Sequence, residues 1–354
     1  MKPINSLFFI IAVVLLVTST TGTAEAMASA TSASGRSWET ELFTQPSQEF
    51  NLDLAKFSLN LSAAAYGDTN ENMLRTLISY GFIPDTAYST NSYKKSGLSG
   101  NDTAAYTFAH QPISIGSKDY TLVAVVIRGT SGEAEWLSNF NINNSGNSPL
   151  VHEGFKNATD VLSSSLNQYM DDLALDRTRT KFLITGHSRG AAIANLLAAD
   201  LSGTERWADA SNIYAYTFAT PNVAKINENP YLNIFNDVNP ADIVTEVPLA
   251  KWGYSRYGVS YDLPEPNQLP ASELAATRLL LEKLITLAPT VEDFYKAKSS
   301  LLFLQENLRT PSTNTIGAHA PQSYMANLNA ANPAVLSARI FELQLQLLPN
   351  TSYI

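Results

Sequence analysis

The sequence predicts an α/β fold in which a mostly parallel central sheet is covered by helices. Between residues 105 and 238, apolar runs typical of buried strands alternate with amphipathic segments typical of helices. The chain has 354 residues, enough for one large hydrophobic core arranged in one or two domains. We place that domain at residues 49–354, after a polar, flexible lead-in over 27–48 that has no core of its own.

The first half of the chain supplies three helices and two strands. Apolar residues recur at helical spacing in each expected helix, and the first two helices are followed by Gly67 and Gly81. The two strands are joined by a polar turn around Gly116, and the second should be central because it is apolar from Leu122 to Ile127. The expected elements are helices over 51–66, 72–80 and 155–173 and strands over 105–113 and 120–127.

Residues 181–201 contain the most informative pattern in the sequence. An apolar run at 182–184 predicts a buried strand, and a Gly-x-Ser-x-Gly sequence follows at 186–190. An Ala- and Leu-rich helix is then expected over 191–201, closed by Gly203. A strand, this pentapeptide and a helix in succession form a nucleophile elbow, a sharp turn that holds a serine hydroxyl clear of the sheet.

The small residues and backbone amides of this turn also fit nucleophilic chemistry. Gly186 and Gly190 leave room where the strand and helix backbones approach each other. The amide of Arg189, at the start of the helix, points to where negative charge would develop on a substrate oxygen. A second donor is expected from Thr130, through its amide or hydroxyl, because Arg128-Gly129-Thr130 ends the neighbouring strand.

A serine hydroxyl needs a base within hydrogen-bonding reach, and the chain has four histidines. His187 adjoins the serine on a turn that should direct it away from the hydroxyl. His110 lies inside a predicted strand and His152 at a helix start, so both fit structural roles. His319 lies in a loop after all the main strands, where catalytic bases are commonly presented. The candidate pair is therefore Ser188 and His319.

The base needs an acidic partner, which in this type of fold follows the serine and precedes the histidine. Further strands are expected over 213–218 and 232–238. Asp237 lies within the second of these and could be a buried structural acceptor. Asp242 lies in the following loop, 239–248, free to turn toward a histidine. We favour Asp242, and Asp237 remains the alternative.

The region between the candidate acid and His319 breaks the alternation of strands and helices. Two amphipathic helices are expected over 272–287 and 291–308, separated by Pro289. They form a helical insertion over about 264–316, close to the carboxyl end of the sheet. We expect this insertion to act as a cap that covers the site and shapes its pocket.

The N-terminus and the overall composition bear on where such a protein would act. Lys2, an apolar run at 7–17 and an Ala-x-Ala pattern at 24–26 predict a cleaved signal peptide over 1–26, and hence secretion. A net charge of −9 without a basic cluster argues against nucleic-acid binding. The chain has no cysteine, which excludes a thiol nucleophile and a thiolate metal site.

Several motifs, taken in order, resemble those of the class 3 lipases, which are fungal-lipase-like α/β hydrolases. The resemblance covers roughly residues 50–328 and departs from the usual pattern at Arg189, Ala191 and Ala219. In fungal members a lid follows the oxyanion residue, which here corresponds to 131–140. The matching segments are 61–66, 125–130 with Trp136, 151–155, 185–196, 218–221, 239–248, and His319 with Tyr324.

The resemblance implies a triad of Ser188, Asp242 and His319, with oxyanion donors at Thr130 and Arg189. It also implies ester hydrolysis, and we expect an exported lipase or carboxylesterase acting through an acyl-enzyme. No metal or organic cofactor is implied. The expected partner is an ester or lipid substrate, met in transient contact with a lipid interface. The alternatives are a phospholipase A1 or an acyltransferase using the same triad, and a catalytically silent binding protein.

Overall fold

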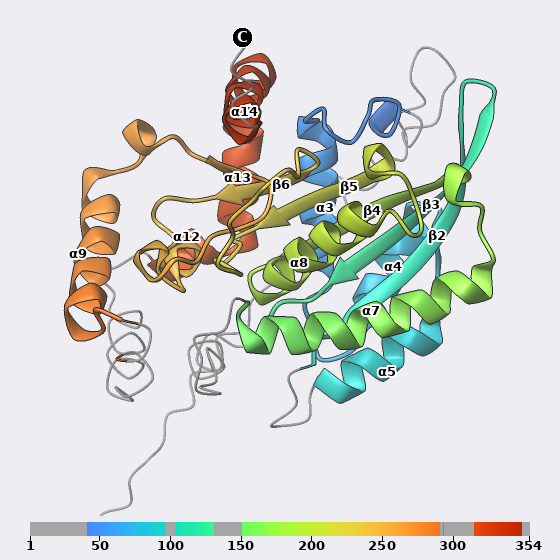
Figure 1. Cartoon of the computed structure of the whole chain (residues 1–354), viewed down its shortest axis with the longest axis horizontal. Helices are drawn as coiled ribbons and strands as arrows, with labels where there is room; N and C mark the ends of the chain where they lie inside the picture. Colours follow the sequence, from blue (N-terminus) through green and yellow to red (C-terminus); the bar gives the residue numbers. More distant parts are fainter. Residues whose placement is uncertain (1–40, 97–102, 131–150, 291–292, 294–314, 349–354) are drawn as a thin grey trace, which may run out of the picture.

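The computed structural model of the chain describes residues 41–96, 103–130, 151–290, 293 and 315–348. The expected signal peptide, the segment corresponding to a lid (131–140) and the expected second cap helix (291–308) lie outside the described residues, apart from residue 293. The expected α/β-hydrolase fold, a mostly parallel sheet covered by helices, is confirmed (Figure 1).

A seven-stranded sheet forms the centre of the molecule, and its strands lie side by side in chain order. The pairs β1–β2 and β2–β3 are antiparallel, whereas the strands from β3 to β7 run parallel to one another. The strands are β1 (Ile83–Pro84), β2 (Tyr106–Ile115), β3 (Lys118–Ile127), β4 (Thr180–His187), β5 (Ile213–Phe218), β6 (Ile234–Val238) and β7 (Val259–Asp262).

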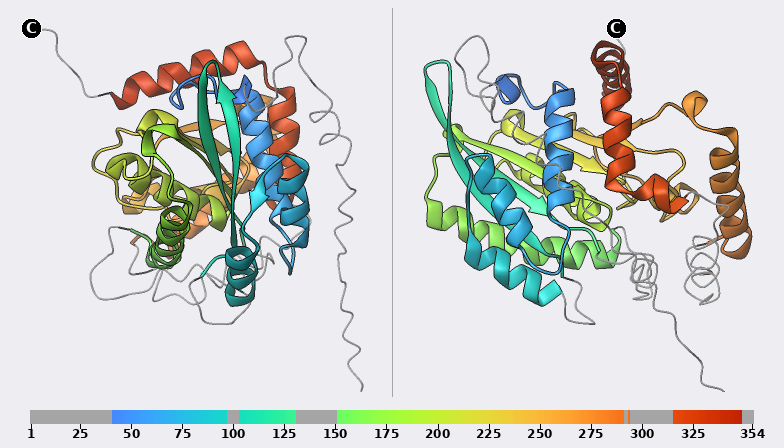
Figure 2. Two further views of the ribbon diagram at one scale, coloured as in Figure 1. Left: turned by 90° about the vertical axis from the view of Figure 1, so that its right-hand side faces the viewer. Right: turned by 180° about the vertical axis from the view of Figure 1, so that it is seen from behind.

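Helices cover both faces of this sheet, giving three layers (Figures 1 and 2). Helices α7 and α8 pack on one face, and α3, α13 and α14 on the other. The described helices are α3 (Leu52–Ala64), α4 (Glu71–Ser79), α5 (Thr86–Ser96), α7 (Glu153–Leu173), α8 (Arg189–Thr204), α9 (Ala271–Leu287), α12 (Thr315–His319), α13 (Pro321–Ala330) and α14 (Pro333–Leu347). Among these described helices, none is long and apolar enough to cross a membrane.

The apolar run in β3 has the composition of a strand that is buried on both faces. Val123 and Val125 belong to the core beneath α7 and α8, whereas Ala124 and Val126 belong to the core beneath α3. Because alternate side chains point to opposite faces, a strand covered on both sides must be apolar throughout. β3 is thus an interior strand, third of seven, next to the strand that leads into the elbow.

Two predicted boundaries differ from the structure. Phe43 is fully buried, with its ring edge-on to Tyr214 at 5.1 Å between centroids, so the packed domain begins before residue 49. Helix α8 continues past Gly203 to Thr204, and its C-cap residue is Glu205, which has a φ of 46°. The Glu205 carboxylate accepts hydrogen bonds from Arg177 and from the amide of Ala210, which hold this uncommon conformation in place.

The predicted helix over 272–287 is present as α9, and it packs on the loop that carries Asp242. Leu280 and Leu284 are buried in one cluster with Ile243 and Val244 of that loop. The hydroxyl of Thr277 donates to the carbonyl of Ala241 at 2.9 Å. The first half of the insertion therefore supports the segment that presents the candidate acid.

Candidate active site

Ser188 occupies the sharp turn between β4 and α8. Its φ and ψ are 60° and −129°, a region that residues with a side chain rarely adopt. The backbone is held there because the amide of Ser188 donates to the carbonyl of Phe218 at 2.9 Å. A Cβ added to Gly190 would lie 2.4 Å from the carbonyl oxygen of Ile127, so only glycine fits that position.

The structure brings Ser188, His319 and Asp242 together in one hydrogen-bonded chain. The His319 Nε2 lies 2.9 Å from the Ser188 Oγ, and its Nδ1 lies 2.8 Å from the Asp242 Oδ2. A carboxylate can only accept, so the Nδ1 of His319 carries the proton and donates it. The Nε2 is then free to accept from the serine hydroxyl. His319, expected in a loop, is the last residue of the short helix α12.

The Asp242 carboxylate is buried and fixed by two further donors. The amide of Val244 donates to its Oδ1 at 3.0 Å, so that Asp242 caps the 3₁₀ turn Ile243–Glu246. The Tyr324 hydroxyl donates to its Oδ2 at 2.8 Å. Burial, with the nearby charge of Asp242, raises the pKa of Tyr324 well above its usual range, so the phenol stays a donor.

Asp237, the alternative acid, lies on β6 and is fully buried. Its carboxyl oxygens have no hydrogen-bond partner within the described part of the chain. Burial and the charge of Asp262 raise its pKa well above the usual range, which favours the neutral form. Asp242, and not Asp237, is therefore the carboxylate that the structure places against His319.

His187 is directed away from Ser188, as expected, but its partners were not foreseen. Its Nε2 lies 2.9 Å from the carbonyl oxygen of His319, and its Nδ1 lies 2.7 Å from the Tyr66 hydroxyl. Since a carbonyl only accepts, the Nε2 donates and the Nδ1 accepts from Tyr66. Burial and the proximity of His319 lower the pKa of His187 well below 6.5, so the imidazole is neutral. It ties the elbow to the end of α12.

The other two histidines lie in structural surroundings. The His110 Nδ1 lies 2.9 Å from the Tyr169 hydroxyl, which joins β2 to α7. His152 caps the N-terminus of α7 and stacks on Phe155. Burial, and then the charge of Arg189, lower the pKa of His152 to about 3.

Thr130 and Arg189 lie on the two segments that meet at the elbow. The Thr130 hydroxyl is shielded from solvent and has no hydrogen-bond partner among the residues described. Arg189 is the first residue of α8, where backbone amides have no acceptor within the helix. The guanidinium of Arg189 donates to the carbonyl of Thr103 at 2.9 Å. The guanidinium of Arg189 is therefore directed to Thr103, while its backbone amide lies at the first turn of α8.

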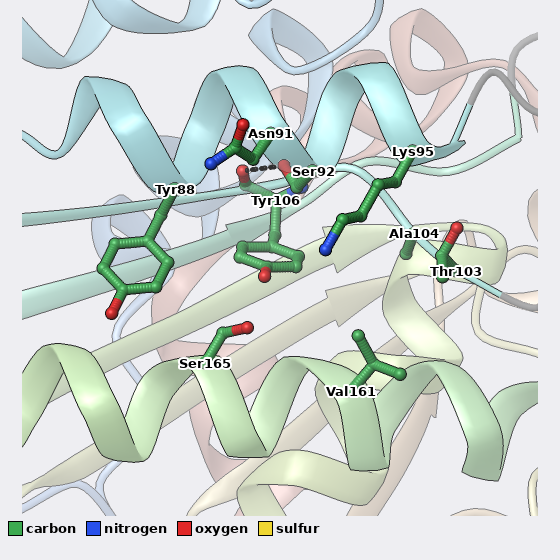
Figure 3. A pocket seen from close by; sticks show the side chains of 9 residues that line it. All are labelled: Tyr88, Asn91, Ser92, Lys95, Thr103, Ala104, Tyr106, Val161 and Ser165. Carbon is green, nitrogen blue, oxygen red and sulfur yellow. Dashed lines mark hydrogen bonds between the residues drawn. The ribbon is translucent and has the colours of Figure 1, made fainter.

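A small pocket of about 130 Å³ lies between α5 and α7 (Figure 3). Figure 3 shows Lys95 and Tyr106 projecting into the space above Val161 and Ser165, with Thr103 at its edge. The residues that line it include no member of the triad. Within the described residues there is also no group of three or more His, Asp or Glu side chains that could hold a metal ion.

The chain is similar to known lipases over its central part. Residues 124–252 match the family described as lipase (class 3). A lipase of Rhizomucor miehei is 28% identical over 165 residues, which are 43% of this chain and 46% of that protein. A secreted mono- and diacylglycerol lipase A of Penicillium cyclopium is 26% identical over 236 residues, 62% of this chain and 73% of that protein.

Solved structures give matches of the same kind. A triacylglycerol lipase whose catalytic centre is described as a serine protease triad is 21% identical with a TM-score of 0.43, covering 61% of this chain and 81% of that one. The matched residues 124–252 include Ser188 and Asp242. His319, which bonds to both, lies outside the matched segment. The central part of the chain, residues 124–252, is thus similar to the class 3 lipases.

Proposed function

We propose that this protein is an exported serine hydrolase of carboxylic esters. The observation that carries the proposal is the unbroken chain of hydrogen bonds from the Ser188 hydroxyl through His319 to Asp242. A serine is a weak nucleophile alone, and an oriented imidazole with a buried carboxylate behind it is the arrangement that activates it.

In the proposed reaction the Ser188 Oγ attacks the acyl carbonyl while the His319 Nε2 takes the hydroxyl proton. The amides of Thr130 and Arg189, with the Thr130 hydroxyl, stabilise the oxyanion of the tetrahedral intermediate. The C–O bond to the alcohol then breaks, and His319 gives its proton to the leaving oxygen. Water repeats the sequence on the acyl-enzyme and releases the acid. Asp242 holds the imidazole in the required tautomer throughout.

The substrates we propose are acylglycerols or similar carboxylic esters. The Penicillium relative, which is named a secreted mono- and diacylglycerol lipase, supports both the substrate class and export. The signal-like pattern over residues 1–26 supports export independently.

A fluorophosphonate probe together with Ser188→Ala tests the proposal. The natural protein should be labelled at Ser188 and should hydrolyse p-nitrophenyl esters, whereas Ser188→Ala should lose both properties and keep its circular dichroism spectrum. Ser164→Ala is the matched control, because Ser164 is exposed on α7 and its hydroxyl donates to the carbonyl of Asp160 in the same helix. Retention of most of the activity in Ser188→Ala would refute the proposal.

Phospholipase A1 activity on the same triad is the second candidate. A chloroplastic phospholipase A(1) of Arabidopsis thaliana is 29% identical over 154 residues, which cover 36% of this chain and 33% of that protein. Initial rates on matched emulsions of triacylglycerol, diacylglycerol and phosphatidylcholine decide between the two. Preferential release of the sn-1 acyl chain from the phospholipid would replace the acylglycerol assignment.

A further inference from the structure

A partly buried cation, Arg256, holds the acid loop, residues 239–248, and lies just after the segment that matches the family. We propose that Arg256 is a positioning residue that fixes this loop so that the Asp242 carboxylate stays beneath His319. The inference rests on the proposed function, because it assigns a supporting role in the same triad. Arg256 lies between the family match, which ends at residue 252, and β7.

The guanidinium of Arg256 joins two backbone segments that follow neighbouring strands. Its Nε donates to the carbonyl of Thr220 at 2.6 Å, and its Nη2 donates to the carbonyl of Thr245. Thr220 lies just after β5, and Thr245 lies in the 3₁₀ turn that Asp242 caps. A planar group with several fixed N–H donors can satisfy both carbonyls at once, whereas an ammonium group on a flexible stem is a point donor.

The contact at Thr245 reaches the carboxylate through one turn of backbone. The Thr245 hydroxyl donates to the carbonyl of Asp242 at 2.8 Å, and the amide of Val244 donates to the Asp242 Oδ1 at 3.0 Å. A shift of the Thr245 carbonyl therefore moves the turn on which the Asp242 side chain is oriented. Loss of the guanidinium removes a support that Tyr324 and α9 do not replace.

Arg256 is itself held in place on both sides. Ser255 pairs with Ala224 in an isolated antiparallel bridge, with its amide 2.8 Å from the Ala224 carbonyl. The amide of Tyr257 donates to the Asn195 Oδ1 at 3.1 Å, and Asn195 is a buried residue of α8. The backbone around Arg256 is thus anchored to α8, and its guanidinium in turn holds the acid loop.

Acidic groups lie near Arg256 on two elements. They are Glu246 and Asp242 on the acid loop and Asp262 on β7, which also lies 3.9 Å from Arg339 of α14, while Tyr324 of α13 is a neutral phenol. Burial lowers the pKa of Arg256, and these groups act in the opposite direction.

The test compares Arg256→Gln and Arg256→Lys with Arg339→Gln, a matched loss of a cation that also lies near Asp262. We expect kcat for p-nitrophenyl ester hydrolysis to fall about tenfold in Arg256→Gln, with KM within about twofold, because the loss falls on the oriented triad and not on substrate binding. Arg256→Lys should recover part of kcat, while Arg339→Gln should match the natural protein.

A readout that does not need activity is the far-downfield proton resonance of the His319 Nδ1–H bonded to Asp242. It should shift or broaden in Arg256→Gln and stay unchanged in Arg339→Gln. An unaltered resonance and kcat in Arg256→Gln, or a loss of kcat that only follows the folded fraction, would overturn the inference. If the natural protein hydrolyses no ester, the proposed function fails, and the resonance still decides whether Arg256 positions Asp242.

Discussion

The two halves of the proposed catalytic triad are positioned by different means. The elbow places Ser188 through backbone geometry: a left-handed φ at the serine and two glycines pressed against neighbouring carbonyls. The base and acid are placed through side chains, since Asp242 and His319 are held by Tyr324, His187 and the turn after residue 242. One half is local in sequence, and the other joins residues 77 positions apart.

The two halves should therefore tolerate different substitutions. In the elbow, a side-chain atom added at either glycine would clash with a backbone carbonyl, so the turn could not form. A side-chain network loses its members one at a time, so single changes there alter the rate while the fold persists. Substitutions in the two halves should therefore affect different measurements.

The largest expected effect separates the two buried aspartates. Asp242→Asn should lower kcat by roughly 10⁴-fold, because an amide can bind the wrong tautomer of His319. Asp237→Asn should leave kcat within a few-fold and should stabilise the fold at pH 8. The reason is that burial raises the pKa of Asp237 above its unfolded value, so ionisation favours the unfolded chain as pH rises. Ester kinetics and urea unfolding measure both, and a crippled Asp237→Asn would contradict the assignment.

The next effect tests the backbone-defined half. Gly190→Ala would place a Cβ 2.4 Å from the Ile127 carbonyl oxygen, and we expect it to destabilise the fold by about 3 kcal/mol or prevent folding. Gly203→Ala, in the same helix, would meet only the Tyr231 hydroxyl at 3.2 Å, so its change should stay within about 0.5 kcal/mol. Thermal unfolding of both variants gives the comparison, and equal effects would show that the elbow has room to spare.

A pH series tests His152, the buried histidine that caps α7. His152 has a pKa of about 3 in the fold, so between that value and 6.5 the unfolded chain binds more protons and stability falls as pH falls. Lowering the pH from 7 to 4 should cost about 3 kcal/mol through this residue. His152→Asn, which keeps a capping side chain, should lose less stability over that range in urea unfolding. An identical slope in both proteins would contradict the assignment.

The smallest expected effect tests one hydrogen bond of the side-chain network, from Tyr324 to Asp242. Tyr324→Phe removes one donor to Asp242 and leaves that of Val244, so kcat should fall by about tenfold with little change in the melting temperature. Tyr169→Phe, which removes the hydroxyl that bonds to His110 and not to a residue of the triad, is the control. A loss in both variants would place the effect in packing and not in the triad.

Elements with strong periodicity could be predicted from the sequence. Strand β5 has the predicted bounds, and α9 begins one residue earlier than expected. Short elements were missed because their stability comes from distant partners. β7 has four residues and exists by pairing with β6, and β1 has two residues beside β2. Helices α5, α13 and α14 were also not anticipated.

The triad residues could be nominated by chain order, but their supports could not. The sequence excludes His187 as the base because its turn directs it away from Ser188, yet its Nε2 donates to the carbonyl of His319. That contact depends on where the end of α12 folds, which no local pattern reports. The role proposed for Arg256 could not be predicted from the sequence either, because both of its acceptors are backbone carbonyls, which every residue has.

The C-terminal helix returns to the segment that enters the fold. The Gln344 amide donates to the carbonyl of Gln48 at 2.7 Å and to that of Leu232 at 2.8 Å. A circular permutant that keeps residues 41–348, joins α14 to the segment before residue 48 through a glycine-rich linker, and opens at the hairpin turn around Gly116 should therefore assemble the same proposed catalytic centre from a chain read in a new order.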